Sequence, residues 1–173
     1  MRRISWLGTA FAAVVLVAGL SAQGKPDLSG KWTLVPDPNA AAPGGGGPGG
    51  GRGGRGGGGG GAFCGQECTI AQDGTTLTVT RTTQGGEQKA TYKLDGSESK
   101  NMQQGRGGQT EIVSKAMVEG DKITITSSQP GREGGPAVTR KTVVSMTGGQ
   151  MEVENTVDFG QGANTTKQTY KKG

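Results

Sequence analysis

Two cysteines and three acidic residues are the side chains of this chain whose types and spacing could do chemistry. Cys64 and Cys68 are the only cysteines, and Glu152, Glu154 and Asp158 are separated by even numbers of positions, two and then four. Two carboxylates can act as general acid and base when both converge on a substrate. Even spacing in a strand instead places all three on one outer, solvated face, which is the interpretation we favour.

The cysteine pair is expected to form a disulfide. Positions four apart in an extended strand lie roughly 13 Å apart, at about 3.3 Å per residue. A disulfide needs its Cα atoms within about 7 Å. A bridge between Cys64 and Cys68 therefore requires a turn, which Gly65 permits. Two alternatives stay open: a metal site, which lacks further soft ligands, and a redox-active pair, which lacks the two-residue spacing of that motif.

The chain contains no histidine. Its absence removes the commonest general base near neutral pH, the Ser-His-Asp and Cys-His arrangements and the imidazole ligands of most metal sites. No remaining set of residues supplies a nucleophile together with its base. We therefore predict a protein that is not an enzyme, with no catalytic residues, no metal and no cofactor.

Residues 1–22 are typical of an export signal. Arg2 and Arg3 precede a mostly apolar stretch from Ile4 to Leu20, and small residues follow it. An uncleaved anchor is the alternative, but this stretch is shorter than the roughly 20 apolar residues that a spanning helix needs. We expect cleavage, a periplasmic or extracellular protein, and no stable membrane insertion after the signal is removed.

Residues 44–61 are almost entirely glycine, which accounts for fifteen of the eighteen positions. Such a segment has no side chains to bury and loses the most backbone entropy on ordering. It is predicted to be a disordered loop. Arg52 and Arg55 give it the look of an RNA-binding RGG segment. A solvated spacer is the simpler interpretation, because an exported protein meets little RNA.

The charge does not favour a nucleic-acid partner. The formal net charge is +5, and removal of Arg2 and Arg3 leaves +3. This excess is spread along the sequence, and the chain has only seven aromatic residues. A nucleic-acid surface would need clustered Lys and Arg with interleaved aromatics.

Alternation of apolar and polar residues predicts strands through the rest of the chain. Leu77 and Val79 share one face of a strand whose other face is threonine. Turns are expected at Asp73-Gly74, Gly85-Gly86 and Asp95-Gly96. About nine strands are predicted in all: three within 69–98, and the others at 31–35, 110–118, 122–128, 138–147, 150–159 and 165–171. Residues 99–109 and 129–136 are expected to be loops.

These strands predict an all-β fold, an antiparallel up-and-down meander of about 8–10 strands closed as a barrel. Pairing the strand of Trp32 with that of Tyr170 would complete the ring. A two-sheet sandwich is the alternative. The domain organisation is then a signal peptide at 1–22, a first strand within 23–43, the Gly-rich loop at 44–61 and the main part of the barrel at 62–173.

Five short segments carry a resemblance to a known group of proteins. They are LSGKWTL (28–34), TIAQDGTTLTV (69–79), TYKLDGSE (91–98), SKAMVEGDKITIT (114–126) and TYKK (169–172). In this order the chain resembles secreted bacterial lipocalin-like β-barrel proteins of unassigned activity. The resemblance implies a small barrel or calyx that holds an apolar ligand, and it brings no catalytic residues.

The barrel interior is the candidate ligand site, because an interior that side chains do not fill can hold a small molecule. Its candidate residues are Trp32, Leu77, Val79, Tyr92, Ile125, Val153 and Phe159. The plain alternative is that these residues pack only against one another. Asn155 falls on the same apolar face and needs a hydrogen-bond partner if it is buried. A structural or protein-interaction module of the cell envelope or exterior is the alternative function. The sequence indicates no oligomeric state.

Overall fold

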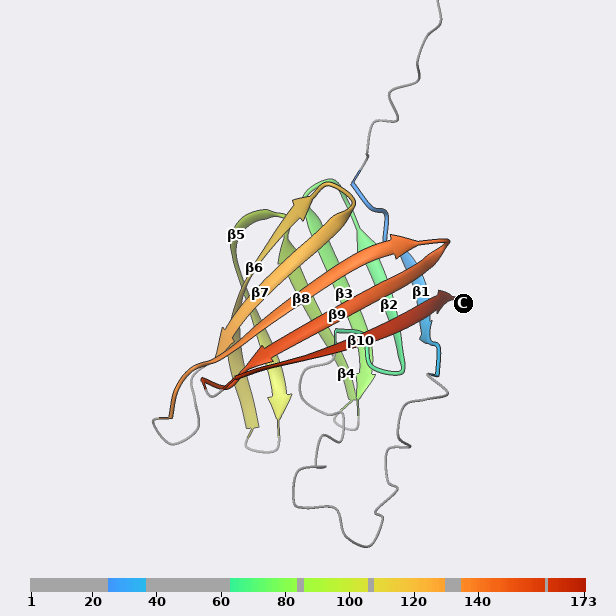
Figure 1. Cartoon of the computed structure of the whole chain (residues 1–173). Helices are drawn as coiled ribbons and strands as arrows, with labels where there is room; N and C mark the ends of the chain where they lie inside the picture. The colour runs from blue at the N-terminus through green and yellow to red at the C-terminus, as the bar shows by residue number, and fades with distance from the viewer. Residues whose placement is uncertain (1–24, 37–62, 84–85, 106–107, 130–134, 161) are drawn as a thin grey trace, which may run out of the picture.

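Ten strands form one antiparallel sheet in this protein (Figure 1). The computed structural model describes residues 25–36, 63–83, 86–105, 108–129, 135–160 and 162–173. The predicted signal peptide and the Gly-rich segment at 44–61 lie outside these ranges, so those two predictions stay predictions.

The strands follow the chain in an up-and-down order. They are β1 (Gly30–Leu34), β2 (Glu67–Gln72), β3 (Thr76–Thr83), β4 (Gly86–Lys93), β5 (Asp95–Gly105), β6 (Gly108–Glu119), β7 (Lys122–Gln129), β8 (Val138–Thr147), β9 (Gln150–Asp158) and β10 (Ala163–Lys172). Their order in the sheet is β4-β3-β2-β1-β10-β9-β8-β7-β6-β5. Every strand except β4 and β5 therefore has a ladder on both sides.

The first and last strands pair as expected. Trp32 lies opposite Lys172, and Leu34 lies opposite Tyr170, in the antiparallel ladder of β1 and β10. This pairing brings the two halves of the meander together, with β8 to β10 crossing in front of β2 to β4 in Figure 1. The predicted fold class, an all-β up-and-down meander closed as a barrel, is confirmed, and the sandwich alternative is wrong.

The barrel closes at a seam between β4 and β5, which are the two end strands of the sheet. No backbone ladder is found there among the described residues, but side chains of β5 take its place. Asn101 accepts a hydrogen bond from the Thr91 amide (2.8 Å) and donates one to the Thr91 carbonyl (3.0 Å). The Lys93 amide donates to the Ser99 hydroxyl at 2.9 Å. An Asn side chain thus mimics one peptide group of a neighbouring strand.

The predicted loop at 99–109 is wrong. Most of it is the second half of β5 and the start of β6, which pair from Glu98 opposite Lys115 to Gly105 opposite Gly108. The segment looked like a loop because it is mostly polar and contains glycine. Its polar side chains are used at the seam, where Ser99 and Asn101 bond to β4 instead of packing in a core.

The turn between β2 and β3 is built on one carboxylate, as its Asp73-Gly74 sequence predicts. Asp73 accepts hydrogen bonds from the amides of Thr75 (2.7 Å) and Thr76 (2.6 Å) and from the Thr76 hydroxyl (2.6 Å). These bonds, the one from the Thr76 side chain first, hold the pKa of Asp73 well below its ordinary value. The turn fixes the point at which β3 begins and hence which of its side chains point inward.

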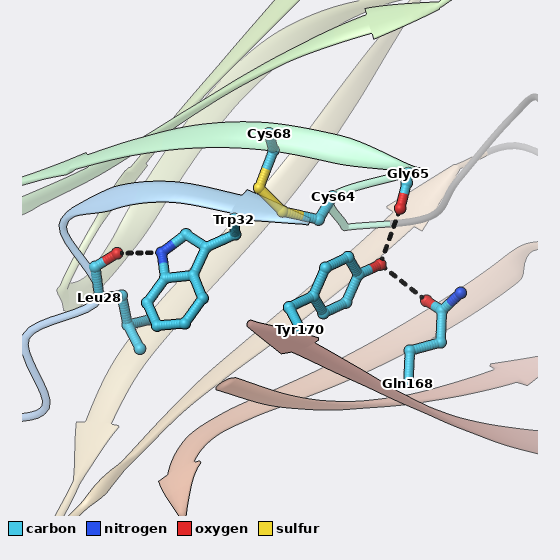
Figure 2. The surroundings of a disulfide bond; sticks show 7 residues. All are labelled: Leu28, Trp32, Cys64, Gly65, Cys68, Gln168 and Tyr170. Carbon is cyan, nitrogen blue, oxygen red and sulfur yellow. Dashed lines mark hydrogen bonds between the residues drawn. A yellow bond between two sulfur atoms is a disulfide. The ribbon is translucent and has the colours of Figure 1, made fainter. Parts of the chain in front are cut away.

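A dense apolar core occupies much of the interior. Trp32 is its largest fully buried side chain, and its indole Nε1 donates to the Leu28 carbonyl at 2.7 Å, a bond drawn in Figure 2. A buried indole N–H needs such a partner. The other large side chains with essentially no exposed surface are Leu28, Leu77, Ile123, Val144, Met151, Val153 and Tyr170.

The structure joins Cys64 and Cys68 in the expected disulfide (Figure 2). Their Cα atoms lie 5.1 Å apart, inside the range that a disulfide spans. The turn that this requires is made at Gly65, whose φ is +74°. The Tyr170 hydroxyl lies 3.1 Å from the Gly65 carbonyl and 3.2 Å from Gln168 Oε1, and its proton can be donated to either. The small loop is therefore fastened to β10.

Candidate ligand site at the polar end of the barrel

On several strands the inward-facing side chains change from apolar at one end of the barrel to polar at the other. On β3 they are Leu77, Val79 and then Arg81; on β8, which runs the opposite way, they are Arg140, Thr142 and then Val144. The barrel therefore has an apolar end, where β3 begins and β8 finishes. It has a polar end, where β3 finishes and β8 begins.

Other strands repeat this gradient. Ile123 and Ile125 on β7 are followed by Ser127, and Met151 and Val153 on β9 are followed by Asn155. Because antiparallel strands alternate in direction, a shared end requires each strand to carry its polar residues at the matching terminus. Several strands of the barrel thus contribute polar residues to the same end.

A cavity of about 60 Å³ lies at the polar end. Arg81 and Arg140 line it together with Tyr92, Thr142 and the outer-rim residue Lys89. Among the residues that the structure describes, no Asp or Glu contributes to this lining. The volume is enough for a few waters or a small chemical group, and it is far below the roughly 300–1,000 Å³ of a site that encloses a whole drug-sized ligand.

The two guanidinium groups are held in a poorly solvated place. Arg81 Nη2 donates to Gln88 Oε1 at 3.3 Å. Burial lowers the pKa of Arg81 from its ordinary value, and burial together with the charge of Arg81 lowers the pKa of Arg140. Burial also raises the pKa of the Tyr92 phenol, which both arginines counteract. The charge of Arg81 thus acts on Arg140, and both cationic residues line the same cavity.

One residue of the cavity lining, Thr142, belongs to a buried polar pair. The Thr142 hydroxyl donates to Asn155 Oδ1 at 2.8 Å, and both side chains are buried. The expectation that a buried Asn155 needs a partner is confirmed. A satisfied pair of this kind fixes the side chains around it, because breaking the bond would leave a buried polar atom without a partner.

Phe63 closes the cavity on the side of the disulfide. It is only 6 % exposed, it lines the cavity, and it immediately precedes Cys64. The disulfide and the bond from Tyr170 to Gly65 hold this part of the chain against the barrel. Phe63 is therefore an apolar plug kept in place by its covalently fastened neighbour.

The cavity approaches solvent beside the seam. Two of its lining residues are exposed, Lys89 on β4 and Met102 on β5, the latter to 53 %. They flank the seam, where Asn101, another lining residue, bonds to Thr91. A route through this place separates side-chain hydrogen bonds and leaves the backbone ladders of the sheet intact.

The structure divides the predicted ligand-site residues into three groups. Tyr92 and Ile125 line the cavity. Those buried in the packed core and absent from its lining are Trp32, Leu77, Val79 and Val153. The inward placement of Phe159 is wrong, because this residue is 52 % exposed. It follows the last residue of β9, so the alternation of the strand no longer governs its direction.

Sequence reasoning missed most of the lining residues, among them Arg81, Arg140 and Phe63. The signal for the arginines was present, since each continues the period-2 face of apolar residues on its own strand. Phe63 carried no such signal, because its burial depends on the turn that the disulfide fixes.

The three candidate carboxylates lie on the outer side, and the structure does not bring them together with the cavity. Glu154 forms an ion pair with Lys167 of β10 at 3.0 Å, and its hydrogen bond raises the pKa of that lysine. Asp158 accepts a hydrogen bond from the Gly160 amide and so stabilises the following turn. The described residues include no group of three His, Cys, Asp or Glu suited to a metal ion. They also include no helix of the length and apolarity needed to cross a membrane.

Comparisons with known proteins concern the fold. No family model matches the sequence, and no curated protein matches it. A zebrafish ileal bile acid-binding protein complexed with cholic acid is 23 % identical, with a TM-score of 0.47 over 62 % of this chain and 72 % of that one. A fatty acid transporter, REP1-NXSQ, is 16 % identical (TM-score 0.44; 62 % and 69 %). A variant of the fluorescent protein UnaG is 18 % identical (TM-score 0.44; 62 % and 70 %).

Proposed function

We propose that this protein is an exported, non-catalytic barrel that binds a small amphipathic molecule at its polar end. The observation that supports this most directly is the cavity between β3, β4, β5 and β8, which the side chains of a closed barrel leave unfilled. A barrel that served only as a structural unit would gain stability by packing that end as densely as the other.

The size of the cavity limits what part of the ligand it takes. About 60 Å³ accommodates one small group of a molecule and not its whole length. The rest of the ligand would lie toward the seam, past Met102, or take the place of Phe63. Apolar lining residues such as Ala90, Ile112 and Ile125 give the first atoms behind that group an apolar surface.

Export is part of the same proposal. Disulfides persist in oxidising compartments and are rare in the cytosol, and Cys64 and Cys68 are paired in this protein. The sequence of residues 1–22 agrees with the same address. Fractionation of cells that express the full chain, with mass determination of its mature N-terminus, tests the location. Recovery of the uncleaved chain in the cytosol would contradict it.

Binding is tested by fluorescence titration of the full protein with two probes, Nile red and dansylamino-undecanoic acid. We expect a saturable increase for at least one probe at micromolar protein. Ala90→Met fills the cavity from its lining and should weaken that binding about tenfold or more. Ala71→Met, which adds the same side chain at an exposed position of β2, should leave it unchanged. Absence of saturation with both probes would favour the structural or protein-interaction alternative.

A further inference from the structure

We infer that the polar end is an anion site in which Arg81 and Arg140 hold the carboxylate of an amphipathic ligand. This inference rests on the proposed function and adds the chemical class of the ligand and the residues that recognise it. Both guanidinium groups line the same cavity from opposite parts of the chain, one on β3 and one on β8.

The first supporting observation is the charge of the residues that line the cavity. The lining holds Arg81, Arg140 and Lys89, and no described acidic residue contributes to it. Burial in a poorly solvated place lowers the pKa of both guanidinium groups, and the charge of Arg81 adds to the lowering at Arg140. An anion bound between the two arginines would be attracted by both positive charges.

The second supporting observation is the inward orientation of the two arginines. A cation that served only solubility would lie on the outer face, as exposed Lys141 does one residue after Arg140 on the same strand. Arg140 and Arg81 instead occupy inward positions, next to Thr142 and Val79 in their period-2 series. Inward arginines beside a cavity are arranged to meet something inside it.

The third supporting observation is the shape of the guanidinium groups and of the cavity. The planar guanidinium fork matches a carboxylate, which accepts two parallel hydrogen bonds from it. About 60 Å³ suits such a small planar group, and the apolar residues Phe63, Ile112 and Ile125 lie around it. The occupant that fits is therefore a carboxylate attached to an apolar body.

Two probes that share one apolar body, one with a carboxylate and one with a neutral methyl ester, test this. Dansylamino-undecanoic acid and its methyl ester are titrated into the full protein and into Arg81→Gln, Arg140→Gln and the matched control Lys141→Gln. A hydrogen bond to a charged group contributes about 1.5–3 kcal/mol, so each arginine variant should bind the acid roughly 10–100-fold more weakly. The ester should bind all four proteins alike, and Lys141→Gln should bind the acid as the unsubstituted protein does.

The outcomes separate the two proposals. Equal affinity for acid and ester, unchanged in both arginine variants, would overturn the anion site and leave the ligand-binding barrel standing. No saturable binding of either probe would overturn both. Should Arg81→Gln fail to fold, which thermal melting reveals, the acid-to-ester ratio and Arg81→Lys decide. Arg81→Lys keeps the positive charge and should still bind the acid more tightly than the ester. Equal affinity for acid and ester, both in the unsubstituted protein and in Arg81→Lys, would contradict the anion site.

Discussion

The two ends of the barrel are built on the same alternating strands and differ in what those strands turn inward. At the apolar end, Leu77, Ile123 and Met151 have essentially no exposed surface and belong to the same core cluster as Trp32. At the polar end, the continuation of the same strands supplies Arg81, Ser127 and Asn155, and a cavity remains. A single strand thus contributes to the packed core with its first inward residues and to the polar end with the next one.

This difference separates stability from binding. Burial of a large aliphatic or aromatic side chain contributes about 1.5–3 kcal/mol, whereas a poorly solvated guanidinium has a cost that only a partner offsets. The apolar end therefore provides the stability that allows the polar end to remain imperfectly packed. Substitutions at matched positions of the two ends should separate these contributions.

The largest expected effect comes from truncating the apolar end. Leu77→Ala should lower the free energy of unfolding by about 2–5 kcal/mol, because it leaves a cavity in a dense core. Arg81→Ala, four residues along the same face of β3, should stay within about 1 kcal/mol of the unsubstituted protein. Urea denaturation measures both. Equal losses would mean that Arg81 supports the fold and that the two ends do not differ as described.

High pH should weaken the protein through Tyr170, which links the core to the disulfide loop. Burial raises the pKa of its phenol from 10.0 to about 12. The unfolded chain then loses its proton first, so stability is complete below about pH 10 and falls as pH rises toward about 12. At 1.36 kcal/mol per unit the loss is roughly 2–3 kcal/mol. Denaturation curves of Tyr170→Phe should lack this component, and an identical fall in that variant would contradict the assignment.

A smaller, more local effect is expected from the disulfide at the polar end. For a loop this short, the chain-entropy relation gives about 2 kcal/mol of stabilisation. The double variant Cys64→Ser/Cys68→Ser should lose that amount and, in hydrogen exchange, loosen the strands beside Gly65 while β7 keeps its protection. Treatment of the unsubstituted protein with a reductant provides the control. Equal loosening of β7 would show that the two ends do not respond separately.

Much of the fold followed from the sequence because it rests on local chemistry. The Asp73-Gly74 turn, the inward face of Leu77 and Val79, and the pairing of the Trp32 and Tyr170 strands needed only turn residues and alternation. The second half of β5 was missed because Ser99 and Asn101 stabilise it through bonds to another strand, and no local pattern reports such bonds.

The site was less predictable than the fold for a related reason. Apolar residues such as Trp32 and Val153 were expected to surround a ligand, and they fill their own end instead. The cavity is at the other end, where Arg81 and Arg140 continue the inward series. Alternation can say that a residue points inward, but it cannot say which end of a barrel the side chains leave unfilled.

The seam affects how readily molecules of this protein associate with one another through their edge strands. Strands with unsatisfied peptide groups act as templates onto which a further strand from another molecule can add. At the middle of the seam, Asn101 occupies both peptide groups of Thr91, and Ser99 occupies the amide of Lys93. The two strands that lack a second ladder therefore bind each other's groups within one molecule, and self-association in register would first have to displace these side chains.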